Sequence, residues 1–108
     1  MTAVKRRKPI SVIDYCVARH GVHKGAFVAA HVAQWAIVSR ELGHVATTVE
    51  YSEYWFCDER SGWRHRADIA SVFGEEWPRV VEAVAAEIDG RLSPRAVSKL
   101  TVPAFAFA

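Results

Sequence analysis

The residues whose types could do chemistry gather just after the middle of this sequence. Arg60, Ser61, Arg64, His65 and Arg66 follow a polar turn in close succession. A guanidinium group can donate two hydrogen bonds to O6 and N7 of guanine, and hydroxyl groups or free N–H groups at a helix start can bind phosphate. We expect Arg64 and His65 to contact base edges. Arg60, Ser61 and Arg66 would then meet the flanking phosphates.

A second basic group is the unbroken run near the N-terminus, formed by Lys5, Arg6, Arg7 and Lys8. Such a run is often a solvated tail. Beside a DNA-binding helix it is also typical of an arm that follows phosphates or enters a minor groove. We therefore expect residues 1–9 to form a flexible basic arm that assists DNA binding.

Metal chemistry is a weaker interpretation of this sequence. Cys16, His20, His23 and His31 form a spacing of C-x3-H-x2-H followed by a more distant histidine. Zinc sites usually carry paired cysteines or a closer histidine pair. We expect Cys16 to lie in the core, and we expect neither a metal site nor another cofactor.

Catalysis is disfavoured as well. Cys57 and His65 have the types of a nucleophile and a base, but about two helical turns separate them along the chain. The sequence has no Gly-rich phosphate loop, no paired-carboxylate site and no Ser-His-Asp order. We expect the protein not to be an enzyme.

The segment 47–74 must position the central basic group. Thr47 and Glu50 fit a capping box that begins a short helix, with Val49, Ser52 and Phe56 expected to face inward. Cys57 then stands in a turn. A second helix is expected over residues 58–73, with Asp58 as its N-cap and Gly74 at its end.

The apolar spacing of the second helix predicts which side is buried. Trp63, Ala67, Ala70 and Phe73 recur at intervals of four, three and three, so we expect them on one inward face. The same periodicity places Arg66 to one side. It places five residues near the opposite face: Arg60, Ser61, Arg64, His65 and Asp68.

Residues 49–54 (VEYSEY) and 57–64 (CDERSGWR) follow a recurrent pattern. They are similar to the form T-V-x-x-(Y/L)-A-x-x-x-x-V-S-x-x-T-(A/V)-Y-R. This pattern resembles the helix-turn-helix of small DNA-binding regulators, and the composition is typical of actinobacterial or actinophage proteins. The resemblance implies a second helix in the major groove of double-stranded DNA, and a homodimer on paired half-sites.

Three features depart from this pattern and leave an alternative open. Phe56 stands where such modules often have glycine, Gly62 stands where a side chain would lock the helices, and Asp58 and Glu59 bring negative charge to the turn. The alternative is a protein-interaction module, such as a phage protein that binds a host factor, built on the same fold.

The remaining sequence predicts further helices around this segment. We expect them over residues 11–20, 26–42 and 78–89, with a short one over 94–100 and an extended apolar tail containing Phe105 and Phe107. In the helix over 26–42, Phe27 and Leu42 belong to the expected buried stripe. No alternating hairpin follows residue 74. The expected fold is an all-α, compact domain of five to six helices with an embedded helix-turn-helix and no wing.

Composition limits the class of protein. The chain has 108 residues, 51% hydrophobic and 24% charged, and a net charge of +2. These values are typical of one folded domain, here over residues 10–92 with a C-terminal extension over 93–108. No apolar run is long enough to cross a membrane and none resembles a secretory signal. We expect a cytoplasmic protein whose dimer interface uses the helix over 78–89 and the tail.

Overall fold

Helices make up most of the chain, and a computed structural model describes residues 9–90 and 93–107. The helices are α1 (Val12–His20), α2 (Val22–Leu42), α3 (Thr48–Tyr54), α4 (Glu59–Phe73), η1 (Gly74–Glu76), α5 (Trp77–Ala86), α6 (Pro94–Val97) and η2 (Ala104–Phe107). Within the described ranges the β-type pairing is an isolated bridge between Ser11 and Thr101. The predicted all-α class is confirmed, and α4 leads directly through η1 into α5.

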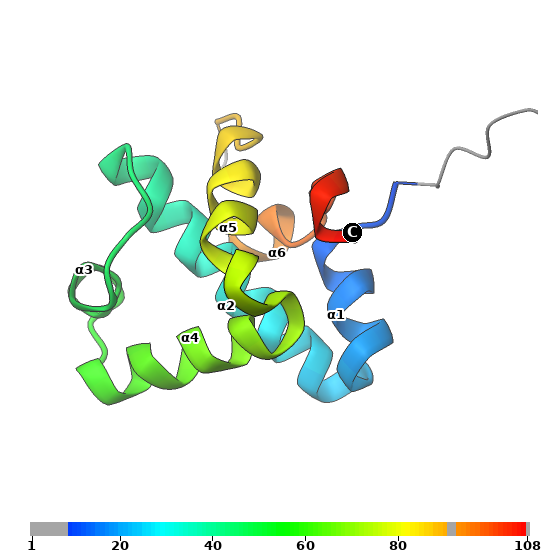
Figure 1. The fold of residues 1–108 in the computed structure, drawn as a ribbon. Helices are drawn as coiled ribbons and strands as arrows, with labels where there is room; N and C mark the ends of the chain where they lie inside the picture. The colour runs from blue at the N-terminus through cyan, green and yellow to red at the C-terminus, as the bar shows by residue number, and fades with distance from the viewer. Residues whose placement is uncertain (1–8, 91–92, 108) are drawn as a thin grey trace, which may run out of the picture.

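The long helix α2 is the centre of the domain, and α1, α3, α4, α5 and α6 all pack against it. Figure 1 shows α4 along one edge of the molecule, with α3 at one end of it and α5 rising from the other. The Trp35 indole of α2 is fully buried. It stacks on Tyr51 of α3 at 4.1 Å between ring centroids and meets Trp77 of α5 edge-on at 5.3 Å.

Short-range capping determines most helix starts, as the sequence predicts. Ser11 accepts a hydrogen bond from the Asp14 N–H at 3.1 Å and caps α1. Ser93 accepts one from the Ala96 N–H at 3.1 Å and caps α6, whose first residue is Pro94. These hydroxyl groups satisfy N–H groups that have no partner within the first helical turn.

The predicted start of the second helix is wrong by four residues, because α2 begins at Val22 rather than Ala26. Gly25 is buried inside α2. A Cβ atom on Gly25 would lie 2.4 Å from Val17 Cα. The glycine therefore permits close backbone contact between α1 and α2, and the two helices are joined through Gly21 alone.

Two predicted core residues of α2 lie at the surface. Phe27 is 68% exposed and Leu42 is 42% exposed. The other members of the predicted stripe, Val28, Val32, Trp35 and Val38, are fully buried, and so is Ala36. Since α2 is surrounded by other helices, its apolar stripe is wider than a single periodic face.

The C-terminal segment packs on its own domain. Val102 is buried, and its N–H donates to the Ile10 carbonyl oxygen at 2.9 Å. Phe105 packs partly against the core, with the Arg79 guanidinium 4.2 Å from its ring centroid. The expectation of an extended tail is wrong, because residues 104–107 form η2. The helices predicted over 78–89 and 94–100 are also shorter, ending at Ala86 and Val97.

The apolar side of α5 is used inside this domain as well. Val80, Val81 and Val84 are buried against the other helices. The dimer interface expected on α5 and the tail therefore has no free apolar stripe on α5. None of the helices in the described ranges is long and apolar enough to cross a membrane.

Replacing Gly25 tests the contact between α1 and α2. Gly25→Ala should lower the free energy of unfolding by about 2 kcal/mol or more, because the added carbon would overlap backbone atoms that cannot move aside. Gly43→Ala is the control: it has a φ of +78° but open space around it, so it should cost about 1 kcal/mol. Denaturant unfolding measures both. Equal losses would contradict the close contact.

Candidate nucleic-acid interface

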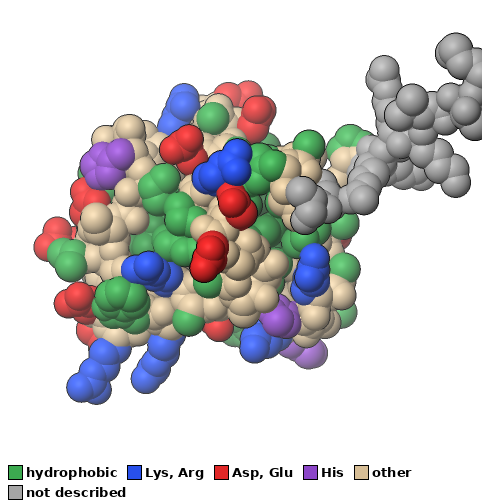
Figure 2. All heavy atoms as spheres, in the orientation of Figure 1, with side chains coloured by type: hydrophobic (Ala, Val, Ile, Leu, Met, Phe, Trp, Pro, Cys, Tyr) green, Lys and Arg blue, Asp and Glu red, His purple; other side chains and the backbone are tan. Residues whose placement is uncertain are grey.

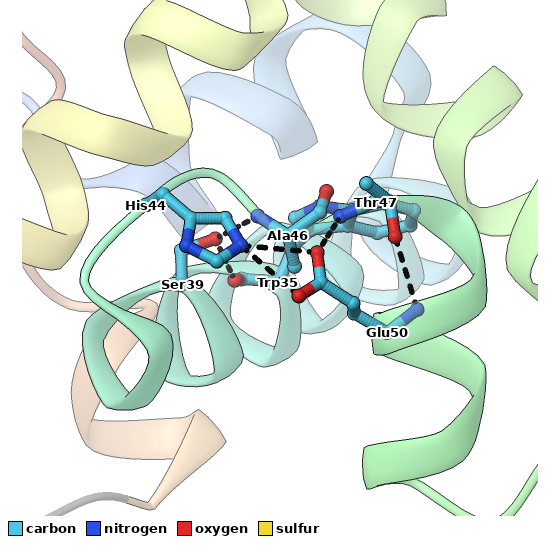
Figure 3. Close-up of polar contacts among 6 residues, drawn as sticks. All are labelled: Trp35, Ser39, His44, Ala46, Thr47 and Glu50. Carbon is cyan, nitrogen blue, oxygen red and sulfur yellow. Dashed lines mark hydrogen bonds and ion pairs between the residues drawn. The ribbon is translucent and has the colours of Figure 1, made fainter.

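The connection from α2 to α3 is held by a chain of buried hydrogen bonds (Figure 3). The Trp35 Nε1–H donates to the Ala46 carbonyl oxygen at 2.9 Å. The Ser39 hydroxyl donates to the Trp35 carbonyl oxygen at 2.8 Å and accepts from the Ala46 N–H at 3.0 Å. Both backbone polar groups of Ala46 are therefore satisfied, and the chain enters α3 from a defined position.

The predicted capping box at the start of α3 is confirmed. The Glu50 N–H donates to Thr47 Oγ1 at 3.2 Å, and the Thr47 N–H donates to Glu50 Oε1 at 2.9 Å. His44 Nε2 lies 3.0 Å from Glu50 Oε2 (Figure 3). The Thr47 N–H and the His44 ring lower the pKa of the Glu50 carboxyl, so that it remains an acceptor at neutral pH.

Residues 55–58 form the turn between α3 and α4. Phe56 has a φ of +53°, a left-handed conformation that suits glycine, and its side chain is 96% exposed rather than inward. The Cys57 N–H donates to the Ser52 carbonyl oxygen at 3.0 Å. Asp58 then accepts from the Ser61 N–H at 2.8 Å and caps α4, as predicted.

Gly62 lets α3 and α4 cross closely. A Cβ atom at Gly62 would lie 2.4 Å from Ser52 Oγ and 2.9 Å from Thr48 Cγ2. In this protein the absence of a side chain at position 62, noted as a departure from the helix-turn-helix pattern, is what allows the close crossing. The crossing leaves the buried Ser52 hydroxyl without a hydrogen-bond partner among the described residues.

The outer face of α4 carries two of the predicted arginines. Arg60 and Arg64 are exposed and lie one helical turn apart, and Ala67 and Ser71 continue the same face. Figure 2 shows basic side chains projecting beneath the edge where Figure 1 places the first half of α4. Sequence reasoning did not predict that Ala67 and Ser71 belong to this face.

The predicted buried face of α4 is wrong over its first half. Trp63 is 51% exposed and Ala67 is exposed as well, although Phe73 is buried as expected. Ile69 and Val72 are buried instead, in line with Gly62. Ile69 and Val72 are apolar, so the sequence contains a signal for this half of the inner face. Nearer the turn, the inner face is formed by Gly62 and His65, which give no apolar signal.

His65 points inward and does not lie on the outer face. Its Nδ1 atom is 2.6 Å from the Tyr51 hydroxyl oxygen, and its ring stacks on His31 of α2 at 3.6 Å between centroids. The Tyr51 hydroxyl also donates to Gln34 Oε1 at 3.0 Å. We expected His65 to contact base edges. The structure corrects this expectation, because residues of α2 and α3 hold the His65 ring on the inner side of α4.

Arg66 lies to one side of the outer face, as predicted. Its guanidinium is 4.7 Å from the Trp63 ring centroid and 5.4 Å from that of Trp77. The two aromatic faces attract the cation and hold it toward α5. Ser61 is half-buried and its N–H is bonded to Asp58, so that N–H group is not free for a phosphate.

The charge around the outer face is mixed. The hydrogen bond from the Ser61 N–H, with a smaller contribution from Arg64, lowers the pKa of Asp58. The ion pairs found within residues 9–90 and 93–107 involve His31, His44 and Arg79, and none involves an arginine of α4. Arg60 and Arg64 thus keep their cationic groups available to an external anion.

The other sequence candidates are dispersed in the fold. Cys16 is buried, and desolvation raises the pKa of its thiol to about 12. His20 Nε2 lies 3.0 Å from Ser71 Oγ, whereas His31 faces α4 through His65. No group of three His, Cys, Asp or Glu residues in the described part of the chain is arranged to hold a metal ion. Lys5, Arg6, Arg7 and Lys8 lie outside the described residues.

Comparisons with known proteins give no relative: no family model, no curated protein and no solved structure matches this chain.

A pair of substitutions tests the crossing of α3 and α4. Gly62→Ala should lower the free energy of unfolding by about 1–3 kcal/mol through overpacking. Ser52→Ala should raise it by about 1 kcal/mol, because it removes a buried hydroxyl that has no partner. In the double variant Gly62→Ala should cost less than it does alone, since the nearest obstructing atom is gone. Additive effects in denaturant unfolding would contradict this contact.

Proposed function

We propose that this protein binds double-stranded DNA sequence-specifically and acts as a transcriptional regulator or a phage control protein. In this proposal, α3, the turn and α4 form a helix-turn-helix, with α4 in the major groove. The basic run of residues 5–8 assists through phosphate contacts, and the protein binds paired half-sites as a homodimer.

The observation that carries the proposal is the pair Arg60 and Arg64 on the outer face of α4. The two residues are separated by about 6 Å along the helix axis. Neither forms an ion pair with a described carboxylate, and their side of α4 is open to solvent. The small side chain of Ala67 allows the middle of this face to approach a groove closely, and Ser71 at its far end contacts His20 of α1. An arginine near a recognition-helix N-terminus is suited to guanine.

The two arginines should differ in their effect on binding. Once a genome-fragment selection has identified a preferred duplex, Arg64→Ala should weaken binding to it by about 1–3 kcal/mol and relax one base preference. Arg60→Ala should weaken binding to all sequences. It should also reduce the slope of log affinity against log salt concentration by about one, as expected for the loss of a single phosphate contact. Fluorescence anisotropy at several salt concentrations measures both effects.

Arg40→Ala provides the control, because Arg40 is exposed in the last turn of α2, on another helix. It should leave the affinity and the base preference unchanged. If the protein binds no duplex even at low salt, or if Arg40→Ala is as damaging as Arg64→Ala, the proposed role of α4 in DNA recognition is wrong.

A protein-interaction module is the second candidate function, and the exposed turn favours it. The Phe56 ring is 96% exposed, although its left-handed backbone conformation is costly for any residue except glycine. Val49 and Trp63 are about half-exposed and line one shallow hollow beside α3 and α4. Large exposed apolar groups of this kind are typical of protein contacts. A host protein is the partner in this alternative.

Substitution of Phe56 separates stability from binding. Phe56→Gly should raise the free energy of unfolding by about 0.5–1 kcal/mol. The substitution relieves the strain of the left-handed backbone, and this gain is partly offset by the greater conformational entropy of glycine in the unfolded chain. Phe56→Ala keeps the strained backbone and should change stability little, because the exposed ring makes few contacts. A stability gain in Phe56→Ala as large as that in Phe56→Gly would contradict the strain. DNA affinity should be the same in both variants if DNA is the partner.

A further inference from the structure

The inner side of α4 is joined to α2 and α3 by a connected group of polar side chains, most of which can titrate. The imidazole rings of His31 and His65 are stacked, with 3.6 Å between centroids and 13° between planes. The Tyr51 hydroxyl contacts His65 Nδ1 and donates to Gln34 Oε1. His31 Nε2 lies 3.8 Å from Asp68 Oδ2. We name these five residues the histidine joint.

The hydrogen bonds assign the neutral form of each ring. The Tyr51 hydroxyl gives its proton to Gln34 Oε1, so its oxygen must accept from His65 Nδ1–H. Gln34 Oε1 is an acceptor and lies 3.4 Å from His31 Nδ1, so that nitrogen also carries a hydrogen. In both rings Nε2 is then the nitrogen that can take up a further proton.

The two proton-binding positions have different surroundings. A proton on His31 Nε2 faces the Asp68 carboxylate and forms an ion pair with it. A second proton on His65 then places two imidazolium rings in a stack, and their positive charges repel at this distance. Burial raises the pKa of the Tyr51 hydroxyl, so Tyr51 is neutral and supplies no countercharge to His65 at neutral pH. The Asp68 carboxylate attracts both rings, and it lies against His31 Nε2.

We propose that the histidine joint positions α4 and responds to protons. When the stacked rings of His31 and His65 together take up a second proton, α4 loosens from α2 and α3. The outer face of α4 carries Arg60 and Arg64 on the opposite side of the same helix. Movement at the joint therefore changes how these arginines are presented. The consequence for DNA binding rests on the proposed function; the joint itself does not.

Electrostatics gives the sign of the pH dependence. Burial is the main cause that lowers the pKa of His31, opposed by Gln34 and Asp68. Burial also lowers the pKa of His65, and the neighbouring His31 lowers it further, whereas Asp68 opposes both effects. The unfolded chain, with ordinary histidine pKa values of about 6.5, therefore binds more protons than the folded protein as the pH falls below that value. The stability due to the joint is present above about pH 6.5 and is lost on acidification.

The pair of His44 and Glu50, at the start of α3, is a second contact between ionisable groups. Its contribution is the same in each variant that retains both residues. A comparison between such variants therefore isolates the joint.

The decisive measurement is the titration of His65, followed by NMR, in the wild type and in His31→Phe. Phenylalanine keeps an aromatic ring beside His65 but cannot be protonated. The pKa of His65 should rise in this variant, by roughly half a unit or more, because the repulsion is removed and Asp68 is left free to attract it. The same His65 pKa in both proteins would show that the rings are not coupled, and the proposal would be wrong.

Amide hydrogen exchange tests the movement of α4. Between about pH 7.5 and pH 5 the amides of α4 should lose more protection than those of α1, after correction for intrinsic exchange, and His31→Phe should reduce this difference. His23→Gln is the control, since His23 is exposed at the start of α2 and should behave as the wild type does. Uniform loss of protection over all helices would contradict a local joint.

A second variant keeps the test valid if His31→Phe does not fold. Asp68→Asn leaves both histidines in place but removes the carboxylate near His31 Nε2. His31 should then titrate at a lower pH than in the wild type, and an unchanged pKa would overturn the assignment of its proton. DNA affinity at both pH values is a separate measurement. Absence of binding at either pH rejects the proposed function, whereas the NMR titrations still decide the joint.

Discussion

The packing of the Trp35 indole is the interaction on which the other helices depend. This side chain is fully buried in α2, stacks on α3 through Tyr51 and contacts α5 through Trp77. Its N–H group also fixes the Ala46 carbonyl oxygen, immediately before the capping box of α3. One residue thus combines a large apolar surface with a directional hydrogen bond. The apolar surface holds the helices together, and the hydrogen bond sets where α3 begins.

The attachment of α4 changes in character along its length. Near its end, Ile69, Val72 and Phe73 bury aliphatic and aromatic surface in the usual way. Near its start, Gly62 provides close contact with α3, and His65 provides a stack and a hydrogen bond. Apolar burial is tolerant of small shifts, whereas close contacts and hydrogen bonds are not. The first half of α4 is therefore held by geometry more than by the amount of buried surface.

The capped helix starts and the end of α4 could be predicted from the sequence because their signals are local, whereas the start of α2 and the ends of α5 and α6 could not. Ser11, Asp58 and Ser93 cap N–H groups three residues away, and Gly74 ends α4 as expected. An all-α fold follows from these signals together with the helical periodicity. None of this requires knowledge of which helices meet.

The orientation of α4 could not be predicted, because its inner residues gain their role from distant partners. Gly62 is small to suit Ser52 and Thr48, and His65 faces inward because it stacks on His31 and hydrogen-bonds to Tyr51. Apolar periodicity does not count glycine or histidine as buried residues. The predicted buried face therefore included Trp63 in place of Gly62 and His65. For the candidate interface, the exposure of Arg60 and Arg64 followed from the sequence, but the inward position of His65 did not.

The missing side chain at Gly62 divides α4 into positions with very different freedom to change. Every other amino acid brings a Cβ atom, and the first atom beyond the backbone already meets α3. On the opposite side, Arg60, Arg64, Ala67 and Ser71 face solvent and can be exchanged without disturbing that crossing. Related chains could therefore diverge in what this helix contacts while retaining one way of holding it. Such a division allows new binding preferences to arise without a new fold.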